Sequence, residues 1–200
     1  MHPFHRGLRL IAICIPLLLP LQSCRHGEEG YTPRPRGYFR IDLPRHEYRR
    51  MDTTLPFTFE QSAHAQTSLQ WKDDGSCWMD VLYPDMDATF KFTYFPIRNA
   101  DSLRGLIVQE ERMMKFHFQK ADDVEYSMIR DPETPLWGQI YDIEGKEVAT
   151  PLQFWMTDSA HHFLRATLYF NFTPNNDSLQ PVIEYLRDDA LHLINTFAWK

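Results

Sequence analysis

The chain has few cysteines and no excess of positive charge. Three cysteines, Cys14, Cys24 and Cys77, occur in 200 residues, too few for the disulfide framework that holds many small secreted domains together. Lysine and arginine number 21 against 27 aspartates and glutamates, which gives a formal net charge of −6. No stretch resembles a basic nucleic-acid-binding patch, so nucleic acid is not an expected partner.

The sequence also lacks the patterns of metal and catalytic sites. Neither HExxH nor CxxC is present, and His161 and His162 are adjacent rather than four residues apart. Carboxylate pairs such as Asp188-Asp189 are expected to be solvated, since catalytic acids need a cleft and shifted pKa values. Cys77 is expected to be a buried small hydrophobe. We therefore predict no catalytic residue, no metal site, no cofactor and no enzymatic activity.

Arg165 is the most unusual charged residue, because it lies in an otherwise apolar stretch from Phe163 to Phe172. Strand alternation would place it on the face opposite Leu164 and Ala166. A structural ion pair is the favoured interpretation, and a recognition role is the alternative.

An apolar run near the N-terminus, Leu10 to Leu21, follows two arginines and no acid. This layout is typical of an export signal. The run is shorter than the roughly 20 apolar residues that span a bilayer. It also contains two prolines, which disfavour a stable helix. We predict a signal peptide over residues 1–23.

Cys24 stands directly after this segment and is preceded by the small residue Ser23. The arrangement resembles a bacterial lipoprotein signal, in which a diacylglyceryl group is added to the cysteine before cleavage. We predict Cys24 as the lipidation site and the lipid bilayer as its partner. The alternatives are an ordinary secreted protein, in which Cys24 is incidental, and an uncleaved anchor.

Residues 24–37 form the predicted tether, a lipidated segment rich in proline and arginine. Pro33-Arg34-Pro35 favours an extended polyproline II conformation. An acid directly after the cysteine would favour retention in the inner membrane, but Arg25 stands there. We therefore expect a cell-envelope protein anchored in the outer membrane, with its domain facing the periplasm.

Residues 38–200 are predicted to form a single α+β domain. The patterns predict one helix capped by Asp101 and a second capped by Asp177, with Gln180 completing a capping box. Short connections between the later strands favour antiparallel pairing. We predict a mostly antiparallel sheet with two long helices packed on it, an element order similar to the PsbP and Mog1 sandwiches. The predicted strands are Phe57–Phe59, Cys77–Tyr83, Ala88–Phe95, Asp123–Arg130, Leu136–Ile143, Thr150–Met156 and Phe163–Phe172.

Several stretches of the mature chain resemble one known family. The segment Tyr31-Thr32-Pro33-Arg34-Pro35-Arg36-Gly37-Tyr38-Phe39-Arg40-Ile41-Asp42-Leu43-Pro44 is similar to the start of the mature GldD family, the gliding-motility lipoproteins of Bacteroidetes. Later similar stretches include Gln153-Phe154-Trp155-Met156-Thr157-Asp158-Ser159 and the ending Phe197-Ala198-Trp199-Lys200. The resemblance implies an envelope lipoprotein associated with the gliding machinery and the linked type IX secretion apparatus. It carries over Cys24 alone as a functional position.

Two functional hypotheses follow. The main one is a non-enzymatic, membrane-anchored lipoprotein that forms part of, or stabilises, the gliding and type IX secretion machinery, with other envelope proteins as partners. The alternative is a periplasmic module that binds a small ligand or glycan. Its pocket would be lined by the aromatic residues Phe90, Phe92, Tyr94, Phe154 and Trp155, which core packing would also explain.

Overall fold

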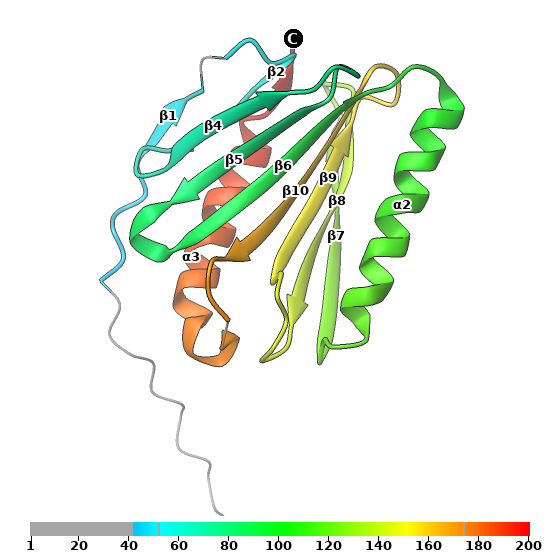
Figure 1. Ribbon diagram of the computed structural model, residues 1–200. Coiled ribbons are helices and arrows are strands. Elements are labelled where there is room, and N and C mark those ends of the chain that lie inside the picture. The colour runs from blue at the N-terminus through cyan, green and yellow to red at the C-terminus, as the bar shows by residue number, and fades with distance from the viewer. Residues whose placement is uncertain (1–41, 52, 174) are drawn as a thin grey trace, which may run out of the picture. The chain divides into compact units, whose positions relative to one another are not determined.

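A seven-stranded antiparallel sheet forms the centre of the fold (Figure 1). The computed structural model describes residues 42–51, 53–173 and 175–200. The predicted signal peptide, Cys24 and the tether lie outside these residues. The described residues belong to one compact unit.

The sheet confirms the predicted α+β class and the antiparallel pairing. Its last four strands in the chain form a meander, and the hairpin of Cys77–Tyr83 and Ala88–Pro96 turns through the 3-10 segment η2 (Pro84–Met86). At this turn Asp87 adopts a left-handed conformation with φ 47°. In spatial order the strands are β4 (Gln66–Trp71), β5 (Cys77–Tyr83), β6 (Ala88–Pro96), β10 (His162–Phe170), β9 (Leu152–Thr157), β8 (Leu136–Glu144) and β7 (Asp123–Asp131).

The two α-helices of the described residues pack on opposite faces of the sheet. Helix α3 (Asn176–Asn195) covers the face to which Phe92 and Phe154 point, and these side chains belong to the main core. Helix α2 (Ala100–Phe118) contributes Met114 to a smaller core with Tyr141 on the other face. No helix of the described residues is long and apolar enough to cross a membrane.

The start of α2 differs from the prediction. Asn99, not Asp101, caps the helix, and its side chain accepts a 2.8 Å hydrogen bond from the backbone N–H of Ser102. The Ser102 hydroxyl oxygen accepts in return from the N–H of Asn99 at 3.1 Å. This reciprocal capping box satisfies two helix donors, and Asp101 becomes a first-turn acid.

Helix α3 also begins earlier than predicted, at Asn176 and not after Asp177. Asn175 occupies the cap position without a side-chain hydrogen bond, so the predicted box between Asp177 and Gln180 is wrong. The reason lies in Asn176, whose side-chain amide donates to the carbonyls of Gly145 and Val148 at 2.8 and 2.9 Å. These bonds fix the chain beside the β8–β9 turn, and the helix begins there.

Four short strands complete the fold and hold its two ends together. Strand β1 (Tyr48–Arg50) pairs with β3 (Glu60–Ser62), and β2 (Phe57–Thr58) pairs with β11 (Ala198–Trp199). Of these, only β2 corresponds to a predicted strand. Two or three residues are too few to show a sequence period, which explains why the other three were missed.

Candidate functional site

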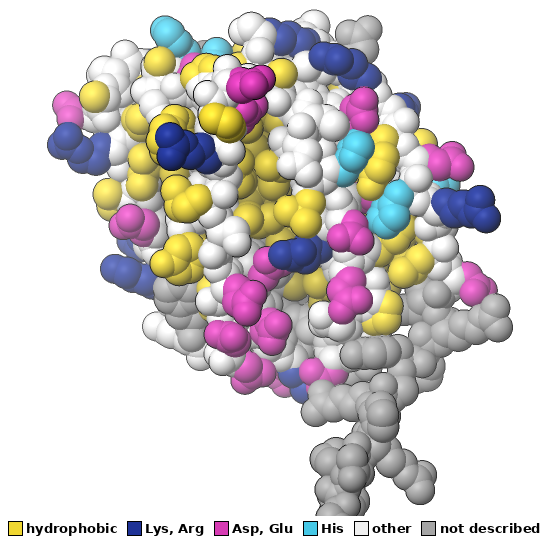
Figure 2. Space-filling view, turned by 180° about the vertical axis from the view of Figure 1, so that it is seen from behind, with side chains coloured by type: hydrophobic (Ala, Val, Ile, Leu, Met, Phe, Trp, Pro, Cys, Tyr) yellow, Lys and Arg dark blue, Asp and Glu magenta, His cyan; other side chains and the backbone are white. Residues whose placement is uncertain are grey.

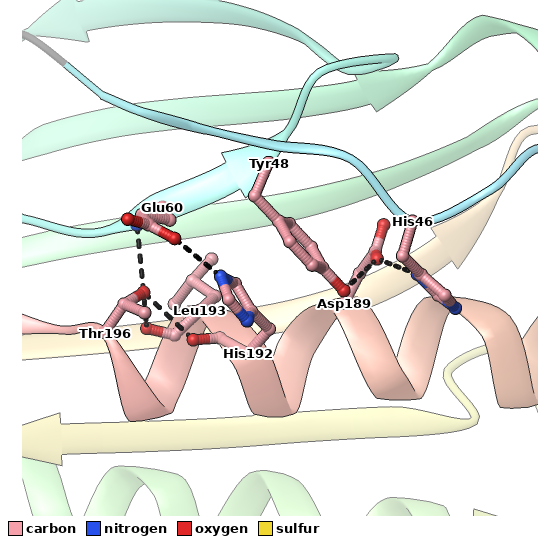
Figure 3. A network of polar contacts seen from close by, with 7 residues as sticks. All are labelled: His46, Tyr48, Glu60, Asp189, His192, Leu193 and Thr196. Atoms are coloured by element: carbon pink, nitrogen blue, oxygen red, sulfur yellow. Dashed lines mark hydrogen bonds and ion pairs between the residues drawn. The ribbon is translucent and has the colours of Figure 1, made fainter.

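A buried carboxylate on α3 joins three segments that are far apart in the sequence. The Asp189 side chain is 1% exposed. Its Oδ1 accepts hydrogen bonds from Nδ1 of His46 at 2.7 Å and from the Tyr48 hydroxyl at 3.0 Å (Figure 3). Its Oδ2 accepts from the Tyr83 hydroxyl of β5 at 3.0 Å. Because a carboxylate oxygen offers only lone pairs, Nδ1 of His46 carries the proton in this contact.

Ring stacking reinforces these hydrogen bonds. His46 stacks on Tyr185 of α3 with ring centroids 4.2 Å apart, and Tyr48 stacks on His192 at 3.5 Å. His192 is itself held by Glu60 of β3, with 2.8 Å between Nε2 and Oε2. The segment before β1 and the β1–β3 hairpin are therefore fastened along almost two turns of α3.

Burial raises the pKa values of the two tyrosine hydroxyls that donate to Asp189. It raises the pKa of the Tyr83 hydroxyl far above its ordinary value, and the nearby negative charge of Asp189 raises it further. The pKa of Tyr48 is raised by the same two causes in the same order. Both hydroxyls therefore stay protonated and keep donating across the physiological pH range.

We call His46, Tyr48, Tyr83 and Asp189 the clamp. All three donors of the clamp bond to the Asp189 carboxylate. Two of them, His46 and Tyr48, are also held by ring stacking on α3. Such an arrangement suits the holding of segments in a fixed geometry, because a satisfied buried network adds rigidity to a fold.

The sequence did not reveal the clamp. Asp188-Asp189 was expected to be a solvated pair, which holds for the exposed Asp188 but is wrong for Asp189, 3% exposed as a residue. The available signal was helical spacing, since Asp189 lies three residues after Leu186 and four before Leu193 on the apolar face of α3. Its donors stand more than 100 positions away, so spacing alone could not identify them.

An ion pair lies on the face of the sheet opposite the clamp. Arg165 of β10 donates through Nη1 to Oε1 of Glu110 at 2.9 Å, which confirms the predicted structural ion pair. The Glu110 side chain is 1% exposed. Burial raises its pKa, and the attraction of Arg165 opposes this shift only in part.

The remaining predicted residues form no common site with the clamp. Cys77 is buried, as expected, and burial raises the pKa of its thiol. His162 shares a 2.9 Å hydrogen bond with the Tyr94 hydroxyl, while His161 is exposed beside Asp158. No group of three or more His, Cys, Asp or Glu side chains within the described residues could hold a metal ion.

The aromatic residues proposed to line a ligand pocket pack into the cores instead. Phe90, Phe92 and Phe154 are each at most 3% exposed, and the cavity that they line with Asp189 measures about 10 Å³. Such a volume has room for about one water molecule. Trp155 lies on the other face of the sheet and stacks on Phe163 at 5.7 Å. Core packing therefore accounts for these side chains.

Comparison with known proteins gives one family. The model of the gliding motility lipoprotein GldD matches residues 28–199. No curated protein matches the sequence. Among solved structures, the chain is similar to the cyanobacterial PsbP (CyanoP) of Synechocystis sp. PCC 6803, with 11% sequence identity, a TM-score of 0.42 and coverage of 81% of this chain and 98% of that chain. The family match spans nearly the whole chain after Cys24, and the protein therefore belongs to the GldD family of gliding motility lipoproteins.

Proposed function

We propose that the protein is a non-enzymatic, lipid-anchored component of the gliding-motility machinery that stabilises this machinery and the linked type IX secretion apparatus. The family match over residues 28–199 is the observation that carries the proposal. The clamp is consistent with a structural role, because its hydrogen bonds join separate segments of the domain to one another.

The proposed anchor is Cys24, whose sulfur receives the diacylglyceryl group before residues 1–23 are removed. The family match begins four residues after this cysteine. A single acyl chain binds membranes only marginally, whereas two or more anchor stably. The diacylglyceryl group of a lipoprotein meets that requirement.

The clamp gives the anchored chain a firm point of attachment. Along the described chain, any pull from the membrane side reaches His46 and Tyr48 before it reaches the main sheet. Both side chains are hydrogen-bonded to Asp189 and stacked on α3. A force applied through the tether would thus be transmitted to α3 before it could separate β1 from β3.

We propose the outer membrane as the location, with the domain in the periplasm. The basis is Arg25, which occupies the position where an acid would favour the inner membrane. Protease treatment of intact cells tests the orientation. A periplasmic domain stays intact until the outer membrane is permeabilised, whereas degradation in intact cells would place the domain on the cell surface.

The functional test compares a deletion strain with strains that express the wild-type chain or Cys24→Ser. We expect the deletion to abolish spreading and to reduce secretion by the type IX pathway. The wild type should restore both, and Cys24→Ser should restore neither despite a folded domain. Affinity purification of the native protein should recover gliding or secretion proteins. Normal movement and secretion in the deletion strain, with none of these proteins recovered, would overturn the proposal.

A further inference from the structure

One edge of the main sheet is long and open. Strand β7 has nine residues and pairs only with β8 among the described residues. Tyr126 and Met128 on this strand are 65% and 63% exposed. An open edge of this length presents unpaired backbone donors and acceptors, which natural proteins normally cover or interrupt.

Two grooves follow this edge on the α3 side of the sheet. The first, about 550 Å³, lies between the start of β7, the end of β8 and the first half of α3. The second, about 350 Å³, lies between the rest of β7 and the C-terminal half of α3. Figure 2 views the molecule from behind and shows a group of acidic side chains beside a hollowed apolar area. Together the two grooves run along most of the length of β7.

The first groove is strongly acidic. Its only lining base, Arg187, is bound to Asp142 by hydrogen bonds of 2.8 and 3.0 Å. No set of these carboxylates within the described residues has the geometry of a metal site. The groove therefore suits positive charges spread along a chain. Its six acids are Asp122, Glu125, Asp142, Glu144, Asp177 and Glu184.

A buried acceptor lines the same groove. Asn176 is 6% exposed, and both side-chain hydrogen bonds described for it use its amide nitrogen. Its Oδ1 has no hydrogen-bond partner among the described residues. A buried oxygen without a donor costs free energy, and a lysine or arginine entering the groove would supply that donor.

The two faces of β7 have different chemistry. Glu125 is opposite Asp142 in the sheet register and shares its face, toward α3, whereas Tyr126 is opposite Tyr141 and faces the α2 side. A strand added beside β7 would therefore place every second side chain on the face of Glu125, where the acids line the first half of the strand and Ser127 and Ile129 follow. Its other side chains would lie beside Tyr126 and Met128.

We propose that the β7 edge binds an extended segment of another protein, in which lysine or arginine alternates with apolar residues. The segment would add to the sheet as an eighth strand, with its basic side chains in the acidic groove. A second copy of this chain is disfavoured, because a two-fold axis would bring the Glu125 face of one copy beside that of the other. The inference does not depend on the proposed role in gliding.

Binding of a capped nine-residue peptide, Lys-Val-Lys-Val-Lys-Val-Lys-Val-Lys, to the full chain in detergent tests this inference. A peptide of the same composition with its five lysines grouped at one end is the matched control. We expect the alternating peptide to bind at least tenfold more tightly than the grouped one. Similar binding of the two peptides, or no binding of the alternating one at millimolar concentration, would overturn the proposal.

Two N-methylated versions of the alternating peptide test strand addition itself. One carries the methyl groups on its odd-numbered residues and the other on its even-numbered residues. Since alternate N–H groups of a strand point to opposite sides, one version should lose binding at least tenfold while the other retains it. Retention by both would show that charge alone attracts the peptide and would overturn strand addition.

Charge reversal locates the site on the protein. The double variant Glu125→Lys/Glu184→Lys should raise the Kd of the alternating peptide at least tenfold. Glu111→Lys, the same change on the exposed side of α2, should change it less than twofold. An equal loss of peptide affinity in the double variant and in Glu111→Lys would overturn the assignment to β7. A concentration-dependent dimer that Tyr126→Lys dissolves would assign the edge to a second copy and overturn the proposed partner.

Discussion

His46 and Asp189 stand 143 positions apart, and Nδ1 of the first donates to Oδ1 of the second at 2.7 Å. The histidine comes from the first described segment and the aspartate from the last helix. The contact thus ties the two ends of the domain together, and the same oxygen accepts from Tyr48.

Removal of the clamp acceptor should destabilise the domain. Asp189→Ala leaves the buried Tyr83 hydroxyl without its partner and frees His46 and Tyr48 from α3. We expect a loss of about 3 kcal/mol in the free energy of unfolding, because a buried polar donor without an acceptor is costly. Urea unfolding of the purified chain measures this change.

The adjacent acid provides the control for the clamp. Asp188 is exposed, and Asp188→Ala should alter the free energy of unfolding by less than about 0.5 kcal/mol. If the Asp188 and Asp189 variants were equally stable, the clamp would not hold the domain together.

Protonation of His162 should weaken the fold in mild acid. Burial lowers the pKa of His162, although Asp158 opposes this effect. The unfolded chain therefore binds a proton at His162 more readily than the folded one, and stability falls as the pH drops below about 6.5. Burial lowers the pKa of His117 too, which acts in the same direction. His162→Gln should lose less stability between pH 7 and pH 5 than the wild type. An NMR titration that gave His162 a pKa of 6.5 or higher would contradict this account.

The buried pair of Glu110 and Arg165 should show strong coupling. Arg165→Met leaves a buried carboxyl group without its cation and should cost about 3 kcal/mol at pH 7. The cost should shrink toward pH 5, because burial already raises the pKa of Glu110 and the lone carboxyl group takes up a proton. The double variant Glu110→Gln/Arg165→Met should regain much of the loss. Simple addition of the two single effects, measured by urea unfolding, would show that the pair is not coupled.

Gly138 should tolerate no side chain. It lies on β8 opposite Met156 of β9, and a Cβ atom there would stand 2.1 Å from the carbonyl oxygen of Trp155. Backbone cannot move aside cheaply, so Gly138→Ala should cost roughly 2 kcal/mol or more. At Gly105 a Cβ atom meets nothing within 4 Å, and Gly105→Ala in α2 should be neutral or stabilising. Thermal unfolding compares the two variants, and equal melting temperatures would contradict the close approach.

The sequence predicted elements with a clear period and missed those held by distant contacts. The pattern from Cys77 to Tyr83 predicted β5 with its observed bounds. The start of α2 was misplaced because Asn99 caps it through a local hydrogen bond that neighbouring polar residues could equally have made. The start of α3 was misplaced because Asn176 is held by Gly145, 31 positions away, which no sequence pattern reveals. The ion pair of Arg165 was predicted because a single charge in an apolar strand needs a partner. The sequence did not indicate that Glu110 would be this partner.

The clamp shows most clearly which contacts a sequence pattern cannot predict. His46 and Asp189 have no spacing relation that a sequence pattern could reveal, and only the folded chain brings them together. Conversely, the lipidation of Cys24 is a prediction from sequence alone, and this residue lies outside the described residues.

The central claim, a lipid anchor at Cys24, is tested most directly by mass spectrometry of the N-terminal peptide of the native protein. We predict that the mature chain begins at Cys24 and that this residue carries a diacylglyceryl group on its sulfur. A peptide that contains Ser23 joined to an unmodified Cys24, or a mature chain that begins at another residue, would contradict the anchor.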